Sequence, residues 1–306
     1  MINIATSMFF AEISGSAVAD VAALGSILIP AMKKKGYPAA FSAAVTSSSA
    51  SLAIIIPPSI PMIVYAVMAQ TSVVQLFVAG IIPGIIGGFL MMLAAYIYAV
   101  RHKLPVEETF NLPNLRKTAR EASLAFLLPF IILGGIFGGV VTATEGAGLA
   151  VVAALVIGLI YKEFDFKRLY QAATEGAIQT ASVMLLVAAS VLLGEFLTIE
   201  QIPQKVAESI IDFTKNKYAV LLILNVFLLI IGFFLHSVAA IILTVPIVMP
   251  LVNAVGIDPV HFGIIVTLNL AIGQQTPPVA SVLVTACSVA KADIWDVTRA
   301  NIMFIC

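Results

Sequence analysis

Two short polar clusters interrupt long apolar stretches of this sequence. The first is Ser14-Gly15-Ser16 and the second is His236-Ser237. A tandem proline follows each cluster, Pro57-Pro58 in the first case and Pro277-Pro278 in the second. Two successive prolines remove two helix donors and clash with the preceding turn, so we expect each pair to break a helix. Hydroxyls and freed carbonyl oxygens at such breaks are the ligands that sodium prefers.

These features predict two ion sites, each between a polar cluster and a helix break. We expect the ion to be bound by Ser14, Gly15, Ser16, Ala53, Pro57, Ser59, His236, Ser237, Gly273 and Thr276. We expect the substrate to be bound by Ser16, Ser48, Ser49, Pro58, Gln275, Thr276 and Pro278. Helix N-termini beyond the breaks favour a carboxylate on that substrate. Small residues also allow close helix packing in membranes, and a tandem proline can be a simple kink, so purely structural roles stay open.

Three more residues are expected to support these sites. Asp20 follows the first cluster, and a charge at membrane depth is costly enough to suggest a function, either orienting the cluster or stabilising a cation. Asn269 precedes the second break, and Glu145 either supports transport or caps the helix that follows it. The two cysteines, Cys287 and Cys306, show no CxxC spacing. We therefore infer no disulfide framework and no zinc or other transition-metal site. We also expect no cofactor apart from a coupling ion.

The elements that position these residues must lie in a lipid bilayer. Hydrophobic residues make up 61% of the 306 residues and charged residues only 10%, against about a quarter in soluble domains. A net charge of zero argues against binding to nucleic acid. Three stretches, 36–100, 218–257 and 259–290, lack Asp, Glu, Lys and Arg. We predict an all-α polytopic membrane protein.

A pattern that occurs twice predicts two repeats. Pro30 lies 27 positions before Pro57, and Pro250 lies 27 positions before Pro277. We interpret each copy as a re-entrant helical hairpin with a polar tip, followed by a transmembrane helix that the tandem proline breaks. The arms of the second hairpin have about 16 residues each, fewer than the about 20 that a crossing needs. Twin broken helices in matching halves are typical of a transporter whose site lies between the halves.

Basic residues predict the orientation of these repeats. Of the 16 Lys and Arg residues, 13 lie in the segments 33–35, 101–121, 161–169 and 291–299. Placing these segments in the cytoplasm satisfies the positive-inside bias. The first hairpin then enters from the inside and the second from the outside, so the two repeats have opposite topology.

The repeats and the spans between them define three expected parts. Residues 1–75 form the first repeat and residues 218–306 form the second, truncated at its last helix, and together they make a transport domain. Residues 76–217 hold connecting and scaffold spans. Within this middle part we expect spans at 76–100, 122–141, 146–160 and 172–194, and a stretch along the outer interface at 199–212.

Ordered motifs along the chain resemble those of the large membrane subunit of TRAP (tripartite ATP-independent periplasmic) transporters, the DctM-type permease. The motifs are Ser14–Asp20, Gly25–Met32, Ile56–Ser59, Leu76–Gly84, Thr142–Glu145, His261–Gly263, Asn269–Gly273 and Thr276–Val279. The resemblance implies an ion-transporter-type fold with inverted repeats and an elevator-type movement. It also implies sodium-coupled uptake of an organic acid across the bacterial inner membrane. The implied partners are a periplasmic substrate-binding protein and a small membrane subunit.

Six positions, at four places in the chain, depart from the family pattern. His236 stands where an aspartate is usual, Ala53-Ile54 replaces Gly-Pro, Gln274-Gln275 replaces an apolar pair, and Ala280 replaces a glycine. A neutral histidine cannot stand in for a carboxylate toward sodium. The second ion site is therefore in question, and His236 either makes it sensitive to protons or is only hydrogen-bonded in place.

Two other interpretations remain. A membrane-embedded enzyme is one, but HExxH, GxSxG and paired intramembrane aspartates are absent from the sequence. An inactive fragment of a larger permease is the other, because both ends look cut and the N-terminal scaffold spans of the family are expected to be missing.

Overall fold

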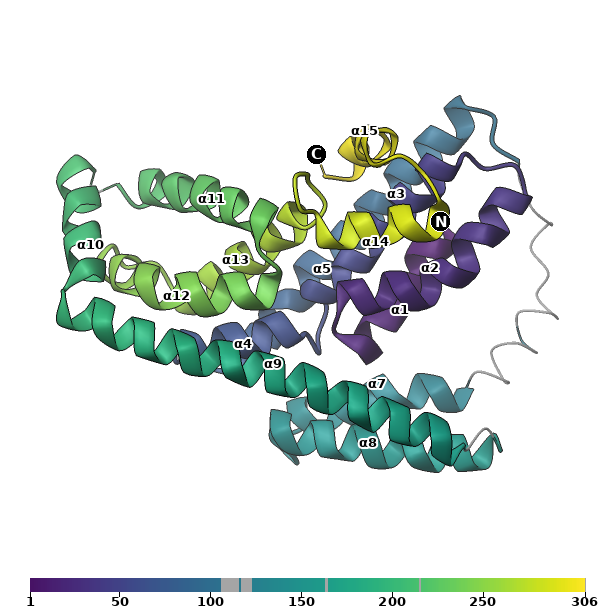
Figure 1. The fold of residues 1–306 in the computed structure, drawn as a ribbon, viewed down its shortest axis with the longest axis horizontal. Helices are drawn as coiled ribbons and strands as arrows, with labels where there is room; N and C mark the ends of the chain where they lie inside the picture. Colours follow the sequence, from purple (N-terminus) through teal and green to yellow (C-terminus); the bar gives the residue numbers. More distant parts are fainter. Residues whose placement is uncertain (106–115, 117–122, 163–164, 215, 306) are drawn as a thin grey trace. The chain divides into compact units, whose positions relative to one another are not determined.

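The computed structural model describes residues 1–105, 116, 123–162, 165–214 and 216–305, and these residues form helices and short connections (Figure 1). The chain divides into two compact units. Unit 1 comprises Met1–Pro105 and Leu186–Cys306, and unit 2 comprises Val106–Leu185. Every candidate site residue except Glu145 lies in unit 1. The functional division at residues 75 and 217 stays a prediction.

Unit 1 begins with the expected helical hairpin. α1 (Ile2–Ser14) ends where Gly15 turns to a left-handed conformation with φ of 60°, which glycine adopts without a Cβ penalty. The tip therefore lies at the predicted polar cluster. The elements that follow are α2 (Ala17–Lys34), α3 (Ala39–Ala50), the 3-10 turn η1 (Ser51–Ile54), α4 (Ile60–Met68) and α5 (Val73–Arg101). The tandem proline separates η1 from α4, as predicted.

The same order of elements recurs in the second half of unit 1. After α10 (Ile202–Phe213) come α11 (Lys217–Phe234), α12 (Ser237–Ala254), α13 (Pro259–Gly273), α14 (Ser281–Ala290) and α15 (Ile294–Ile305). α11 and α12 form a hairpin whose tip is at His236, and the second tandem proline separates α13 from α14. Both tandem-proline peptide bonds are cis. The predicted tips and breaks are confirmed in both copies.

Helix contacts within unit 1 come in matched pairs. α2 packs against α14 and α12 packs against α4, so the second arm of each hairpin contacts the far half of the other copy's broken helix (Figure 1). α5 packs against α13 and α15 packs against α3 in the same reciprocal manner. Lys33 Nζ donates to the Ala290 carbonyl oxygen at 2.7 Å, and the buried Tyr65 hydroxyl donates to the Pro259 carbonyl oxygen at 2.6 Å. The two copies of the pattern are therefore packed against each other through corresponding helices, and their inverted relation stays a prediction.

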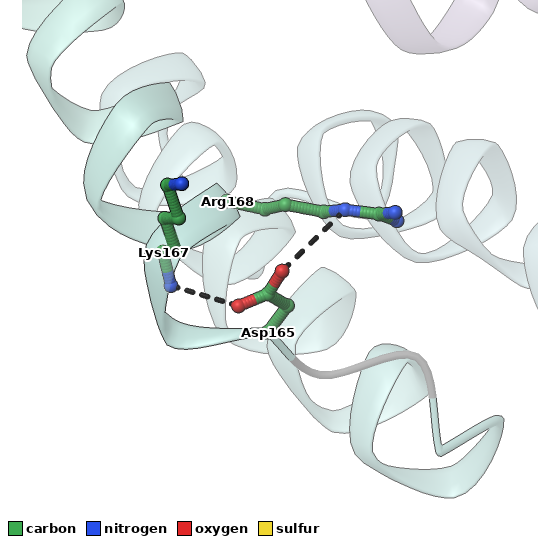
Figure 2. Close-up of polar contacts among 3 residues, drawn as sticks. All are labelled: Asp165, Lys167 and Arg168. Carbon is green, nitrogen blue, oxygen red and sulfur yellow. Dashed lines mark hydrogen bonds and ion pairs between the residues drawn. The ribbon is translucent and has the colours of Figure 1, made fainter.

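Unit 2 contains α7 (Ser123–Phe137), α8 (Ala143–Ile160) and the first part of α9 (Phe166–Ile199), which extends the predicted span 172–194 at both ends. Asp165 accepts the Lys167 amide at 2.9 Å, and its other oxygen lies 3.6 Å from Arg168 Nε (Figure 2). These exposed residues cap the N-terminus of α9, and their ion pair adds little stability because water screens it. The predicted cytoplasmic segment 101–121 lies largely outside the described residues, as does Cys306.

Five described helices are long and apolar enough to cross a membrane by length and composition. They are Val73–Arg101, Ala143–Ile160, Phe166–Leu197, Lys217–Phe234 and Ser237–Ala254. The last two are the arms of the second hairpin and have 18 residues each. The expectation that these arms are too short to cross is therefore wrong, because both helices begin earlier than the apolar run alone suggested. Whether the hairpin is re-entrant depends on where its tip lies.

Glycines bring α5 against the first break. A Cβ built at Gly80 would lie 2.6 Å from the Ile55 carbonyl oxygen, and one at Gly84 would lie 2.7 Å from Ile56 Cγ1. α5 therefore contacts the backbone of residues 55 and 56, where the hydrogen-bond pattern of the first broken helix is interrupted. Small residues at such crossings allow membrane helices to approach closely.

We expect Gly80→Ala to lower the stability of unit 1 by about 1–3 kcal/mol, because the added methyl forces α5 away from the break. Thermal unfolding of the purified protein measures this effect. Gly87→Ala on the same helix is the matched control, since its Cβ would make only ordinary contact at 3.4 Å with Leu52 Cδ2. Equal losses from the two variants would contradict the close approach at Gly80.

Candidate functional site

The tip of the first hairpin touches the first break. The Ile60 amide donates to the Gly15 carbonyl oxygen at 3.4 Å, and a Cβ at Gly15 would lie 2.9 Å from the Pro58 carbonyl oxygen. Ser59 is buried and donates its hydroxyl hydrogen to the Ile54 carbonyl oxygen at 2.7 Å. The structure thus brings together the first tip and the first break. The ion-binding role of these residues stays a prediction.

A buried carboxylate lies beside the first tip. The Ser14 hydroxyl accepts the Ser16 amide at 3.1 Å and donates to Asp20 Oδ1. Asp20 is 0% exposed, and its Oδ2 has no hydrogen-bond partner among the described residues. The helices α1, α3 and α14 pack against α2 and carry no Lys or Arg. A buried carboxylate without a cation is costly, so Oδ2 is available as a ligand for one.

The tip of the second hairpin touches the second break in a similar way. The Val279 amide donates to the Phe233 carbonyl oxygen at 3.2 Å. Gly232 on α11 and Gly273 at the end of α13 approach so closely that a Cβ at Gly273 would lie 2.6 Å from the Gly232 Cα. His236, at the tip, is exposed and makes no cap hydrogen bond from its side chain. Where the first tip has a buried carboxylate, the second has an exposed imidazole.

Ala280 closes the second break in a left-handed conformation, with φ of 42° and ψ of 57°. Residues with a side chain pay about 1–2 kcal/mol for this conformation, and β-branched residues pay more. We expect Ala280→Gly to fold as the parent does and Ala280→Val to lower the melting temperature. Thermal unfolding of the two purified variants measures the difference. A valine variant as stable as the glycine variant would contradict this backbone conformation.

A ring of buried hydrogen bonds joins the second break to the first repeat. Gln275 Nε2 donates to the Ser47 carbonyl oxygen at 2.7 Å, and Gln275 Oε1 accepts from Asn301 Nδ2 at 3.2 Å. The Ser48 hydroxyl donates to Asn301 Oδ1 and closes the ring. These residues are at most 2% exposed. The ring involves α3, the second break and α15, so it crosses from one repeat to the other.

A cavity of about 360 Å³ lies beside this ring, between the two repeats. Much of its lining comes from residues that are 220 positions apart in the sequence and so occupy matching places in the repeats. These pairs are Ser48 and Leu268, Ser51 and Ala271, Leu52 and Ile272, Ile55 and Gln275, and Pro83 and Met303. The lining thus comes from both segments of unit 1, and its polar groups come from one member of each of three pairs.

Other predicted residues lie apart from this arrangement. Ser49 is buried between α3 and α1, where its hydroxyl donates to Ser7 Oγ at 2.8 Å. Asn269 donates to Asn225 Oδ1 at 2.7 Å and so joins α13 to α11. Glu145 lies in unit 2 and forms a capping box with Thr142, which confirms the alternative of a helix cap. Any part these residues have in transport stays a prediction.

Over residues 1–306 the chain matches the family described as tripartite ATP-independent periplasmic transporter, DctM component. The chain belongs to the DctM family. The family consists of transporter permeases, so the expectation that this protein is no enzyme is confirmed. The membrane-embedded enzyme is thereby excluded as an interpretation.

Three relatives illustrate the DctM family. The isethionate TRAP transporter permease protein DctMQ of Oleidesulfovibrio alaskensis is 43% identical over 299 residues, which cover 97% of this chain and 47% of the relative. The C4-dicarboxylate TRAP transporter large permease protein DctM of Pseudomonas aeruginosa is 38% identical, with 97% and 70% covered. The 2,3-diketo-L-gulonate TRAP transporter large permease protein YiaN of Escherichia coli is 34% identical, with 97% and 70% covered. The chain thus spans about half of the first relative's length and 70% of the others.

Sequence reasoning missed Asn301 of this DctM-family chain. Asn301 is 0% exposed and occupies the centre of the ring, between Ser48 and Gln275. The available signal was a lone amide within the apolar run that ends the chain, 301–306. The residues next to Asn301 in the sequence are not its hydrogen-bond partners. Those partners become apparent only when α15 packs against α3.

Proposed function

We propose that this chain carries out sodium-coupled uptake of an organic acid across the bacterial inner membrane, as part of a TRAP transporter. One observation carries the proposal: each hairpin is hydrogen-bonded, at its tip or in the helical turn before it, to the break that follows it in the chain. In a continuous helix the peptide carbonyls are hydrogen-bonded to the next turn. Here, at the two breaks, carbonyls and hydroxyls lie together without that ladder, in an otherwise apolar protein. Broken backbone of this kind is tolerated in a membrane where it lines a binding site.

The position of the tips supports re-entrant hairpins. Each tip meets the middle of a broken helix, so if that helix crosses the bilayer the tip lies at its mid-depth. The reciprocal contacts of α2 with α14 and of α12 with α4 support two repeats of opposite topology. Rigid repeats that rock or slide around a site at this depth give alternating access, and the elevator-type movement belongs to this proposal.

The first tip offers the stronger cation site. Asp20 Oδ2 supplies a negative charge, and Ser14 connects that carboxylate to the backbone of Ser16. The second tip lacks a carboxylate, because His236 stands where the family usually has an aspartate and the residue 220 positions after Asp20 is Ala240. We therefore assign the principal sodium site to Ser14–Ser16 with Ala53, Pro57 and Ser59, and a weaker one to Ser237, Gly273 and Thr276.

An organic acid is the substrate class that the relatives favour. Those described above are named for isethionate, C4-dicarboxylates and 2,3-diketo-L-gulonate. In this chain α4 and α14 begin directly after the breaks, and helix N-termini favour anions. Ser16, Pro58, Thr276 and Pro278 lie at these places and are the substrate contacts that we propose. The proposed partners are a periplasmic substrate-binding protein and a small membrane subunit, as in TRAP systems.

Uptake into proteoliposomes tests the proposal. The chain is reconstituted with its binding protein and small subunit, and labelled isethionate and succinate are offered with and without an inward sodium gradient. We expect uptake of an organic acid that requires both the gradient and the binding protein. Conduction without a gradient would reject coupled transport, and no uptake of any acid under these conditions would favour the inactive fragment.

A further inference from the structure

One atom, the Ser47 carbonyl oxygen, determines which group donates and which accepts in every hydrogen bond of the buried ring. The Ser47 carbonyl oxygen can only accept, so Gln275 must present Nε2 to it. Gln275 Oε1 then faces Asn301, which must present Nδ2. Asn301 Oδ1 is left to accept the Ser48 hydroxyl, as observed. Each member of the ring therefore specifies the orientation of the next, and both ends of the Gln275 amide are occupied.

The ring has no counterpart at the positions that lie 220 residues away in the sequence. The residues 220 positions away from Gln275, Ser48 and Asn301 are Ile55, Leu268 and Ile81. These are apolar and cannot form an equivalent ring. At the first break the backbone is instead contacted by α5, through Gly80 and Gly84. The second break is thus fastened to the first repeat by directional bonds, and fully satisfied buried networks of this type specify one arrangement.

We propose that Asn301 is a positioning residue for the second ion site. Through Gln275 it holds the second break against α3, and the neighbouring Gly273 and Thr276 keep their place opposite the second hairpin tip. Because the His236 tip brings no carboxylate, ion binding there depends on well-placed neutral oxygens. By fixing the position of these oxygens, Asn301 compensates for the carboxylate that the second site lacks. This inference rests on the proposed function, since it assumes that the second break binds sodium.

A sodium titration of the purified full chain tests this role. Melting temperature is followed in nanodiscs as sodium chloride replaces choline chloride at constant ionic strength, and the weaker of the two proposed binding steps gives the half-saturating sodium concentration of the second site. Asn301→Leu keeps the size of the side chain and removes the ring. We expect it to raise that concentration about fivefold, the equivalent of one lost hydrogen bond. Gln275→Leu should have the same effect, and the double variant should be no worse than either single one.

Thr298→Val is the matched control on the same helix. Its hydroxyl donates to the Ile294 carbonyl oxygen of its own helix at 2.7 Å, outside the ring, so the half-saturating concentration should not move. Ser48→Ala, which removes one bond of the ring, replaces Asn301→Leu if that variant does not fold. Variants that melt earlier but keep the parental sodium response would show a structural ring and overturn the proposal. A parent without any sodium response would reject the proposed coupling ion, and the positioning role with it.

Discussion

Gly273→Ala is expected to abolish sodium-coupled uptake. The added Cβ would lie 2.6 Å from the Gly232 Cα and 2.9 Å from the Gly232 carbonyl oxygen. These are backbone atoms, which cannot rotate aside as a side chain could, so α11 and the end of α13 must separate. Separation pulls the second tip from the second break and disperses the oxygens proposed to bind the ion. Transport in proteoliposomes measures the loss, and it should fall to the level of empty liposomes.

Gly158→Ala is the control for this substitution. Gly158 lies on α8 in unit 2, and a Cβ there meets nothing within 4 Å. Alanine in an exposed helix interior is tolerated or slightly favoured over glycine. We therefore expect parental uptake from Gly158→Ala. Full activity of Gly273→Ala at parental expression would contradict the close approach of the two glycines.

Asp20→Asn is expected to weaken sodium binding at the first tip by about tenfold or more, because a neutral amide replaces the carboxylate that balances the cation. The variant keeps the shape of the side chain and its contact with Ser14. It also removes the cost of an unpaired buried charge, so the sodium-free protein should be at least as stable as the parent. This combination of greater stability and weaker sodium response distinguishes a ligand from a residue needed only for folding.

Glu12→Gln provides the comparison for Asp20. Glu12 lies on α1 of the same hairpin and is only partly buried, so the protein encloses it less completely than Asp20. We expect its sodium response to match that of the parent. If Asp20→Asn also responds to sodium as the parent does, the carboxylate is not an ion ligand and the first site must consist of neutral oxygens alone.

Local chemistry made the tips and breaks of this fold predictable. Two prolines in a row cannot continue a helix, and Ser14-Gly15-Ser16 places a flexible residue between two apolar arms, so both features could be located from composition and spacing. The repeat followed from the recurrence of these features at a constant offset. The lengths of the arms were harder to predict, because Lys217 belongs to α11 although a charged residue was taken to lie outside it.

The hydrogen bonds of the candidate site could not be predicted from the sequence, because they join residues that are far apart in the chain. Ser48, Gln275 and Asn301 are hydrogen-bonded to one another although they are far apart in the chain, and nothing near any of them in sequence indicates its partners. The hydrogen bonds of the Gln275 amide within the ring are equally invisible in the sequence, and its predicted contact with substrate stays a prediction. Ala280 was equally hard to predict, because a left-handed conformation normally calls for glycine or asparagine.

A high-resolution experimental density map of the protein in sodium chloride, compared with one in choline chloride, tests the central claim most directly. We predict an ion between the first hairpin tip and the first break, within bonding distance of Asp20 Oδ2 and present only in sodium. A continuous helix through Pro57-Pro58, or a tip that lies away from the break with no ion in either salt, would contradict the account.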